Sequence, residues 1–243
     1  MASRVVRLTS VLAAAAATTA VLAGCGDGSE PAGEGPSGRA AVDLVLDDGA
    51  LPSGYAVATL GKDQMQQILD QMVDSTKGVE VDPERCRLDG SVPEKADTAD
   101  AGLMVATGHG LAVSESVEVA ADTADGGDLD AARAIVTDPR CETVTVKVAA
   151  GPIKDSRVSM TTTVLDVPRG EAAAVLAVKR VTRTENGART GERTVLSGRA
   201  VVKGYAVTVE MSPLDGEAGA ADVDEDAFAA VLAAAISEVA ARA

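Results

Sequence analysis

The chain has 243 residues and a formal charge of −15 at pH 7, with 37 acidic residues against 22 basic ones. A protein this acidic repels nucleic acid and anionic lipid headgroups, so we expect no nucleic-acid partner. The aromatic residues are Tyr55, Tyr205 and Phe228, which leaves almost no stacking platforms for sugars or bases. The core must therefore be built from aliphatic side chains.

The first 25 residues have the organisation of an export signal. Two arginines precede an apolar run over residues 11–20 that is too short to span a bilayer, and two small residues precede Cys25. The sequence Val-Leu-Ala-Gly-Cys over residues 21–25 resembles the lipobox of bacterial lipoproteins. This resemblance implies removal of residues 1–24, a diacylglycerol on the Cys25 sulfur, and a cell-membrane anchor at the extracytoplasmic face. The alternative is an ordinary secretory signal in which Cys25 is a chance residue.

Beyond the signal, residues 25–40 and residues 41–243 differ in composition. The first stretch is rich in Gly, Pro and Ser, cannot bury apolar area, and is predicted to be a flexible tether. The second stretch is long enough for one domain with its own core, and we expect a single sensor-like domain there. Loss of the two signal arginines would bring the formal charge of the remaining chain to −17.

Two cysteines remain once Cys25 is assigned to the lipid. Cys86 and Cys141 would lie in a compartment that permits disulfides, so we expect them to pair. The alternative is a metal site with two thiolate ligands, which needs further ligands in a chain with a single His. We therefore predict one disulfide, no metal and no cofactor.

Three segments have the periodicity of helices. Residues 61–78 carry apolar side chains at steps of three and four, and the segment ends at Gly78, which suits a left-handed cap. A shorter helix is predicted over residues 128–136. The third segment, residues 224–241, has an apolar stripe at helical spacing and acidic residues at its amino end, where the helix dipole favours them.

The remaining segments alternate apolar and polar residues, as half-buried strands do. The clearest is 143–148, where three valines alternate with Thr and Lys, and Asn186-Gly187 is a strong hairpin signal. Further strands are expected at residues 105–107, 111–120, 158–167, 173–184, 194–203 and 205–211. Because strands this close in sequence pair antiparallel, we predict an α+β domain in which helices pack on one face of an antiparallel β-sheet.

Sequence signatures of known reactions are missing from the chain: it has no nucleophile elbow, zinc-protease helix, glycine-rich phosphate loop or cysteine pair at metal spacing. His109 is the only imidazole, and its position between two glycines favours a polar turn over a general base. Acidic residues over 122–130 loosely resemble a calcium loop but lack its spacing and bidentate Glu, so a solvated loop is favoured. We predict no catalytic residues.

One region runs against the acidic balance of the chain. Residues 154–203 hold ten Lys or Arg and five Asp or Glu. If the hairpin around Asn186-Gly187 gathers basic side chains on one surface, they could bind an anionic headgroup, a glycan or an acidic envelope protein. The candidate anion-binding residues are Arg180, Arg183, Arg189 and Arg193. The alternative is a solvated outer sheet face with alternating charges.

Several short motifs together carry a family resemblance. The lipobox, the tether, Leu-Pro-Ser-Gly-Tyr at residues 51–55 and Val-Asp-Pro-Glu-Arg-Cys at residues 81–86 are similar to actinobacterial cell-envelope lipoproteins of unknown function. Those proteins in turn resemble the extracellular sensor domains of actinobacterial serine/threonine kinases. The resemblance implies an α+β domain with a disulfide and a ligand-binding cleft, and it carries over no catalytic residue.

The leading hypothesis is therefore a non-catalytic, monomeric binding or sensor-like module of the cell envelope. Its partners would be the membrane, through the lipid anchor, and an anionic envelope ligand or an envelope protein. A carrier of lipid or another hydrophobic ligand is the alternative. A less favoured one is an envelope hydrolase that uses His109 or a pair of acids.

Overall fold

The computed structural model describes residues 39–58, 66–67, 79–87, 101–120, 127–148, 156–186, 189–214 and 223–243. The expected signal, Cys25 and most of the expected tether lie outside the described residues, so they stay predictions. Of the helix expected at residues 61–78, only Gln66 and Gln67 are described, and both are helical.

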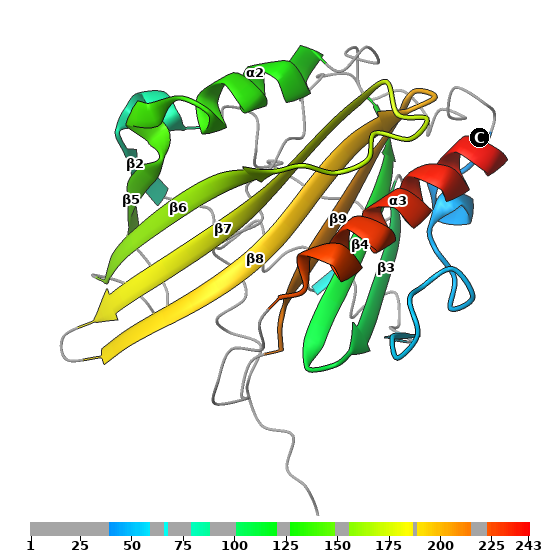
Figure 1. Ribbon diagram of the computed structural model, residues 1–243, viewed down its shortest axis with the longest axis horizontal. Coiled ribbons are helices and arrows are strands. Elements are labelled where there is room, and N and C mark those ends of the chain that lie inside the picture. The colour runs from blue at the N-terminus through cyan, green and yellow to red at the C-terminus, as the bar shows by residue number, and fades with distance from the viewer. Residues whose placement is uncertain are drawn as a thin grey trace, which may run out of the picture.

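The described strands form one antiparallel sheet of nine strands, in the order β1-β3-β4-β9-β8-β7-β6-β5-β2 (Figure 1). The strands are β1 (Ala56–Val57), β2 (Val79–Asp82), β3 (Ala101–Gly108), β4 (Leu111–Val119), β5 (Thr143–Val148), β6 (Arg157–Leu165), β7 (Ala174–Asn186), β8 (Arg189–Val202) and β9 (Tyr205–Pro213). The α+β class and the antiparallel sheet are confirmed, and β5 has the predicted bounds. Alternation alone does not predict the edge strands β1 and β2.

One face of the sheet is covered by the helix α3 (Glu225–Arg242), which lies across β9 and β8 (Figure 1). Asp224 caps its amino end, because its carboxylate accepts the backbone N–H groups of Asp226 and Ala227 at 2.9 and 3.0 Å. The apolar stripe of α3 is buried against the sheet through Phe228, Val231, Leu232, Ala235, Ile236 and Val239. We call this side the α3 face.

The opposite side, which we call the α2 face, carries the helix α2 (Gly127–Val136) over β6 and β7. Its apolar residues join a small cluster formed by Leu129, Ala132, Leu176, Val178 and Val201. Helices therefore cover both faces, and the prediction that they pack on one face is wrong. The reason lies in β7, where residues 175–178 are all apolar. Since successive side chains point to opposite faces, each face there needs a cover.

The chain enters the domain through the 3-10 helix η2 (Ala41–Leu44), which packs on β3 and β4 at the α3 face. Leu44 and Leu46 are buried in the main core there. The hydroxyl of Tyr205 donates a hydrogen bond to the carbonyl of Arg39 at 2.9 Å, which holds the start of the described chain to β9.

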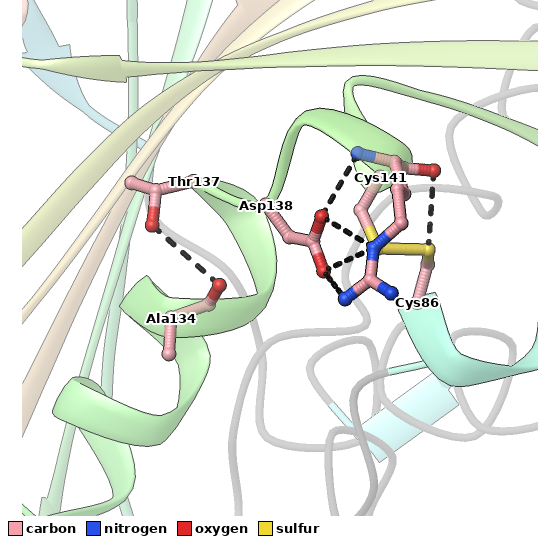
Figure 2. Close-up of polar contacts among 6 residues, drawn as sticks. Cys86, Ala134, Thr137, Asp138 and Cys141 are labelled. Atoms are coloured by element: carbon pink, nitrogen blue, oxygen red, sulfur yellow. Dashed lines mark hydrogen bonds and ion pairs between the residues drawn. A yellow bond between two sulfur atoms is a disulfide. The ribbon is translucent and has the colours of Figure 1, made fainter.

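A disulfide joins Cys86 to Cys141, as predicted, with their Cα atoms 5.4 Å apart. Each cysteine ends a short 3-10 helix beside an Asp-Pro pair, in η3 (Glu84–Cys86) and η4 (Pro139–Cys141). The Asp138 carboxylate accepts hydrogen bonds from the backbone N–H and the guanidinium of Arg140. Figure 2 shows Asp138 beside the disulfide. The hydrogen bonds from Arg140 lower the pKa of Asp138 to about 2, so the Asp138 carboxylate stays ionised in moderately acidic solution. The disulfide fastens the β2–β5 edge of the sheet.

Gly198 on β8 makes close packing of α3 possible. A Cβ added there would lie 2.6 Å from Leu232 Cδ2 and 3.0 Å from Phe228 Cζ. We predict that Gly198→Val lowers the free energy of unfolding by about 1–3 kcal/mol, because the extra methyl groups displace α3. Gly191→Val on the same strand is the control, since a Cβ there meets nothing within 4 Å. Equal losses in urea unfolding would contradict this packing.

The disulfide closes a sequence separation of 55 residues. On the chain-entropy account, replacing both cysteines by Ala should lower the free energy of unfolding by about 4 kcal/mol. Dithiothreitol should destabilise the wild-type protein to a similar extent and leave the double variant unaffected. Unfolding midpoints that do not respond to reduction would show that the bond adds no stability.

Candidate functional site

A cluster of polar side chains lies in the middle of the α2 face, on β7, β8 and β9. Strand register places them together: Arg180 is opposite Val195, Arg193 is opposite Thr182, and Glu210 is opposite Ser197. Residues on one strand that differ by an even number share a face, so Arg180 and Thr182 lie on the α2 face with Leu176 and Val178. Arg193 lies on that face too, because it is opposite Thr182. We call Arg180, Arg193, Arg199 and Glu210 the arginine cluster.

Arg180 and Glu210 are an oppositely charged pair within this cluster. Arg180 is only 5% exposed, and burial lowers the pKa of its guanidinium, an effect that the charge of Glu210 opposes. Burial likewise raises the pKa of Glu210, while the charges of Arg180 and Arg193 lower it. Each ion therefore offsets part of the cost of burying the other.

Arg193 is half-buried and reaches β9. Its Nη2 atom donates hydrogen bonds to Ser212 Oγ at 3.1 Å and to the carbonyl of Pro213 at 3.2 Å. Opposite it, the buried Oγ1 of Thr182 has no hydrogen-bond partner in the described structure. Ser197 is also buried on this face, so hydroxyl groups accompany the arginines. Guanidinium and hydroxyl donors together suit an anionic oxygen ligand.

Arg199 was not among the candidate residues, although it belongs to the arginine cluster. It lies opposite Leu176 on β7 and Thr208 on β9, on the same face as Arg193 six residues earlier. The even spacing from Arg193 was the sequence signal that could have identified it. Three arginines and one carboxylate thus share the α2 face of the central strands.

The four predicted arginines do not share one surface. Arg183 is three residues from Arg180 and therefore lies on the α3 face, where its side chain is 62% exposed and 3.9 Å from Glu192. Arg189 begins β8 opposite Asn186, and its side chain is outside the description. We expected all four arginines to converge. The structure instead brings Arg180 and Arg193 to the α2 face, where Arg199 also lies.

The outer part of the α3 face matches the alternative of alternating charges. Lys147 on β5 lies 3.7 Å from Glu80 on β2, and both side chains are exposed, as are those of Arg183 and Glu192. Such exposed pairs contribute little to stability and are screened by salt. Arg183 is thus part of a solvated face and separate from the arginine cluster.

His109 lies in the turn between β3 and β4, as expected, with a positive φ of 53°. Its Nε2 is 3.2 Å from the carbonyl of Ser53, and its ring meets the Tyr55 ring edge-on with centroids 5.5 Å apart. Gly54 has a φ of 91°, and a Cβ there would collide with the imidazole. These contacts hold residues 51–55 against the hairpin, which is a structural use of the imidazole.

Within the described residues, no group of three His, Cys, Asp or Glu is placed to hold a metal ion. None of the described helices is both long enough and apolar enough to cross a bilayer. Of the acidic residues over 122–130, Asp128 and Asp130 belong to α2, and the stretch before residue 127 is not described.

No family model matches the sequence, and no curated protein matches it. Among solved structures, the chain is similar to a putative uncharacterized protein from Mycobacterium smegmatis, an Rv0999 ortholog, with a TM-score of 0.49 and 15% identity, covering 82% of this chain and 96% of that one. It is also similar to the extracellular domain of PknH from Mycobacterium tuberculosis, with a TM-score of 0.46 and 13% identity, covering 81% and 92%.

The arginine cluster predicts unequal costs for two similar substitutions on β7. Arg180→Met should lower the free energy of unfolding by about 3 kcal/mol, because it leaves the charge of Glu210 buried without its main counter-ion. Arg183→Met, on the exposed face, should change it by less than about 0.5 kcal/mol. Urea unfolding of both variants checks this, and a cost that is the same for both would refute the assignment of faces.

Proposed function

We propose that this chain is a lipid-anchored, extracytoplasmic, sensor-like binding module without catalytic activity, and that its ligand presents an anionic group. The arginine cluster is the observation that carries this proposal. The central strands of the α2 face carry one buried guanidinium, that of Arg180, and two half-buried ones, those of Arg193 and Arg199, where apolar residues of similar volume would cost less. Such costly groups concentrate at binding sites, and Arg is the side chain best suited to phosphate and carboxylate.

The disulfide supports an extracytoplasmic location. Disulfides form and persist in oxidising compartments and are rare where glutathione and thioredoxin keep thiols reduced. The Cys86–Cys141 bond therefore fits a chain that is exported. The lipobox at residues 21–25 supports anchoring of the exported chain at Cys25.

The surroundings of His109 support a binding role over a hydrolytic one. A general base needs a nucleophile or water to activate and a group that orients its ring. The recorded contacts of the imidazole are a backbone carbonyl, a Tyr ring and a Gly. The arginine cluster holds three cations and one carboxylate, and the hydroxyl groups of Thr182 and Ser197 share its face, which suits binding of an anion.

The anchor is tested by Cys25→Ser in the native host. We expect the variant to move from the membrane fraction to the soluble fraction, because the only sulfur that the lipobox offers for the acyl glyceride is gone. Immunoblots of fractionated cells measure this. Cys86→Ser serves as the control, since it removes a cysteine sulfur that lies outside the lipobox. A Cys25→Ser protein that stays with the membrane would refute lipid anchoring.

The ligand-binding claim is tested with inorganic phosphate, which is a small anion. Chemical-shift titration should show saturable binding that weakens with added sodium chloride. Arg193→Gln should raise the dissociation constant about 10-fold or more, the effect of losing one charge-assisted hydrogen bond.

Arg183→Gln is the matched control, because it makes the same charge change on the exposed α3 face. It should leave the phosphate titration within about twofold of wild type. Equal weakening by the two substitutions would mean that phosphate responds to net charge alone, and the arginine cluster would not be the site.

A further inference from the structure

A buried carboxylate lies on the opposite face from the arginine cluster. Glu115 on β4 is 1% exposed and points to the α3 face between Val113 and Val117, opposite Met104 on β3 and Val209 on β9. Its Oε2 accepts the backbone N–H of Leu46 at 2.8 Å. The carboxylate therefore binds the segment through which the chain enters the domain.

The surroundings of Glu115 do not balance a negative charge. Its Oε1 is buried and has no hydrogen-bond partner in the described structure. The charged group that faces it from α3 is Glu238, which has the same sign. An ionised carboxylate in this position carries a desolvation cost that one backbone N–H does not repay.

Other contacts hold the same entry segment and do not depend on the protonation of Glu115. Arg242 of α3 donates to the carbonyl of Asp43 at 3.1 Å, and its guanidinium lies 3.7 Å from the Asp47 carboxylate while also pairing with Glu238. The hydroxyl of Tyr205 binds the carbonyl of Arg39. These groups fasten the segment at Arg39, Asp43 and Asp47, and Glu115 fastens it at Leu46.

We propose that Glu115 is a proton-controlled latch for the entry segment, residues 39–47, which connects the domain to its expected tether. The protonated carboxyl is neutral, fits the apolar pocket and accepts the Leu46 N–H. The ionised carboxyl favours opening of the segment, because opening brings the charge to water. An open segment adds about nine residues to the tether, or up to ~30 Å of reach from the anchor.

The direction of the pH effect follows from the proton affinity of the two states. Burial raises the pKa of Glu115 from its ordinary value of 4.5 to about 7, with Glu238 adding to the rise and the Leu46 hydrogen bond opposing it. In the open state the carboxyl returns to water and to an ordinary pKa. Closure is therefore most favourable below pH 4.5 and weakens as the pH rises to about 7. Leu44 and Leu46 keep the closed state populated above that pH.

Hydrogen exchange of the full chain, read by mass spectrometry on a peptide that spans residues 39–50, measures this opening. After correction for the intrinsic exchange rate, protection in the wild type should fall roughly 50- to 100-fold between pH 5 and pH 8. In Glu115→Gln, which keeps an acceptor oxygen for the Leu46 N–H but cannot ionise, protection should not change with pH. Peptides from β8 report global unfolding and should not follow this pH profile.

Glu118→Gln is the matched control, because it removes a carboxylate from the same strand but on the α2 face. It should retain the wild-type pH profile. If Glu115→Gln fails to fold, the Leu46 amide resonance of the wild type still provides the test and should titrate with a midpoint near pH 7. A midpoint near pH 4.5, or a pH-independent entry segment in the wild type, would overturn the latch.

Discussion

The register of the β7–β8 hairpin is the constraint on which the two faces of this molecule depend. Pairing runs without interruption from Ala174 opposite Val201 to Asn186 opposite Arg189. Because side chains alternate between faces, a slip of one residue in β7 would move Arg180 beneath α3 and bring Lys179 to the α2 face. The same register places Gly198 beneath Leu232, where a larger residue would displace the helix. Packing and the candidate site are thus fixed together.

Both faces combine an aliphatic core with a small number of buried charges. The α2 face carries the arginine cluster, and the α3 face carries Glu115. Most other buried side chains are apolar, so the buried ions Arg180 and Glu115 lie in surroundings that penalise charge, and their charge states respond strongly to a counter-ion or a proton. The β2–β5 edge has only a small apolar cluster around Val144, and there the disulfide supplies the stability that so small a cluster does not. The two proposals concern groups on opposite sides of the sheet, so one can fail without the other.

Local periodicity was sufficient for much of the fold, because it reports which elements form. The alternation in residues 143–148, the stripe of α3 and the Cys86–Cys141 pair all agree with the structure. The pairing of β2 with β5 joins residues far apart in sequence, which no local pattern encodes. Parity could have separated Arg183 from Arg180 and shown Glu115 on the inward side with Val113 and Val117. Burial of Arg180 could not be predicted, since it depends on how three strands and their covers assemble.

Native mass spectrometry of the chain purified from its own host tests the central claim most directly, since it shows whether the arginine cluster holds an anionic ligand in the envelope. We predict a bound mass on the wild-type protein and on Arg183→Gln that is lost from Arg193→Gln, and that dissociates as an anion. A wild-type protein that carries no bound mass at low ionic strength, or a bound mass that is the same on all three proteins, would contradict the account.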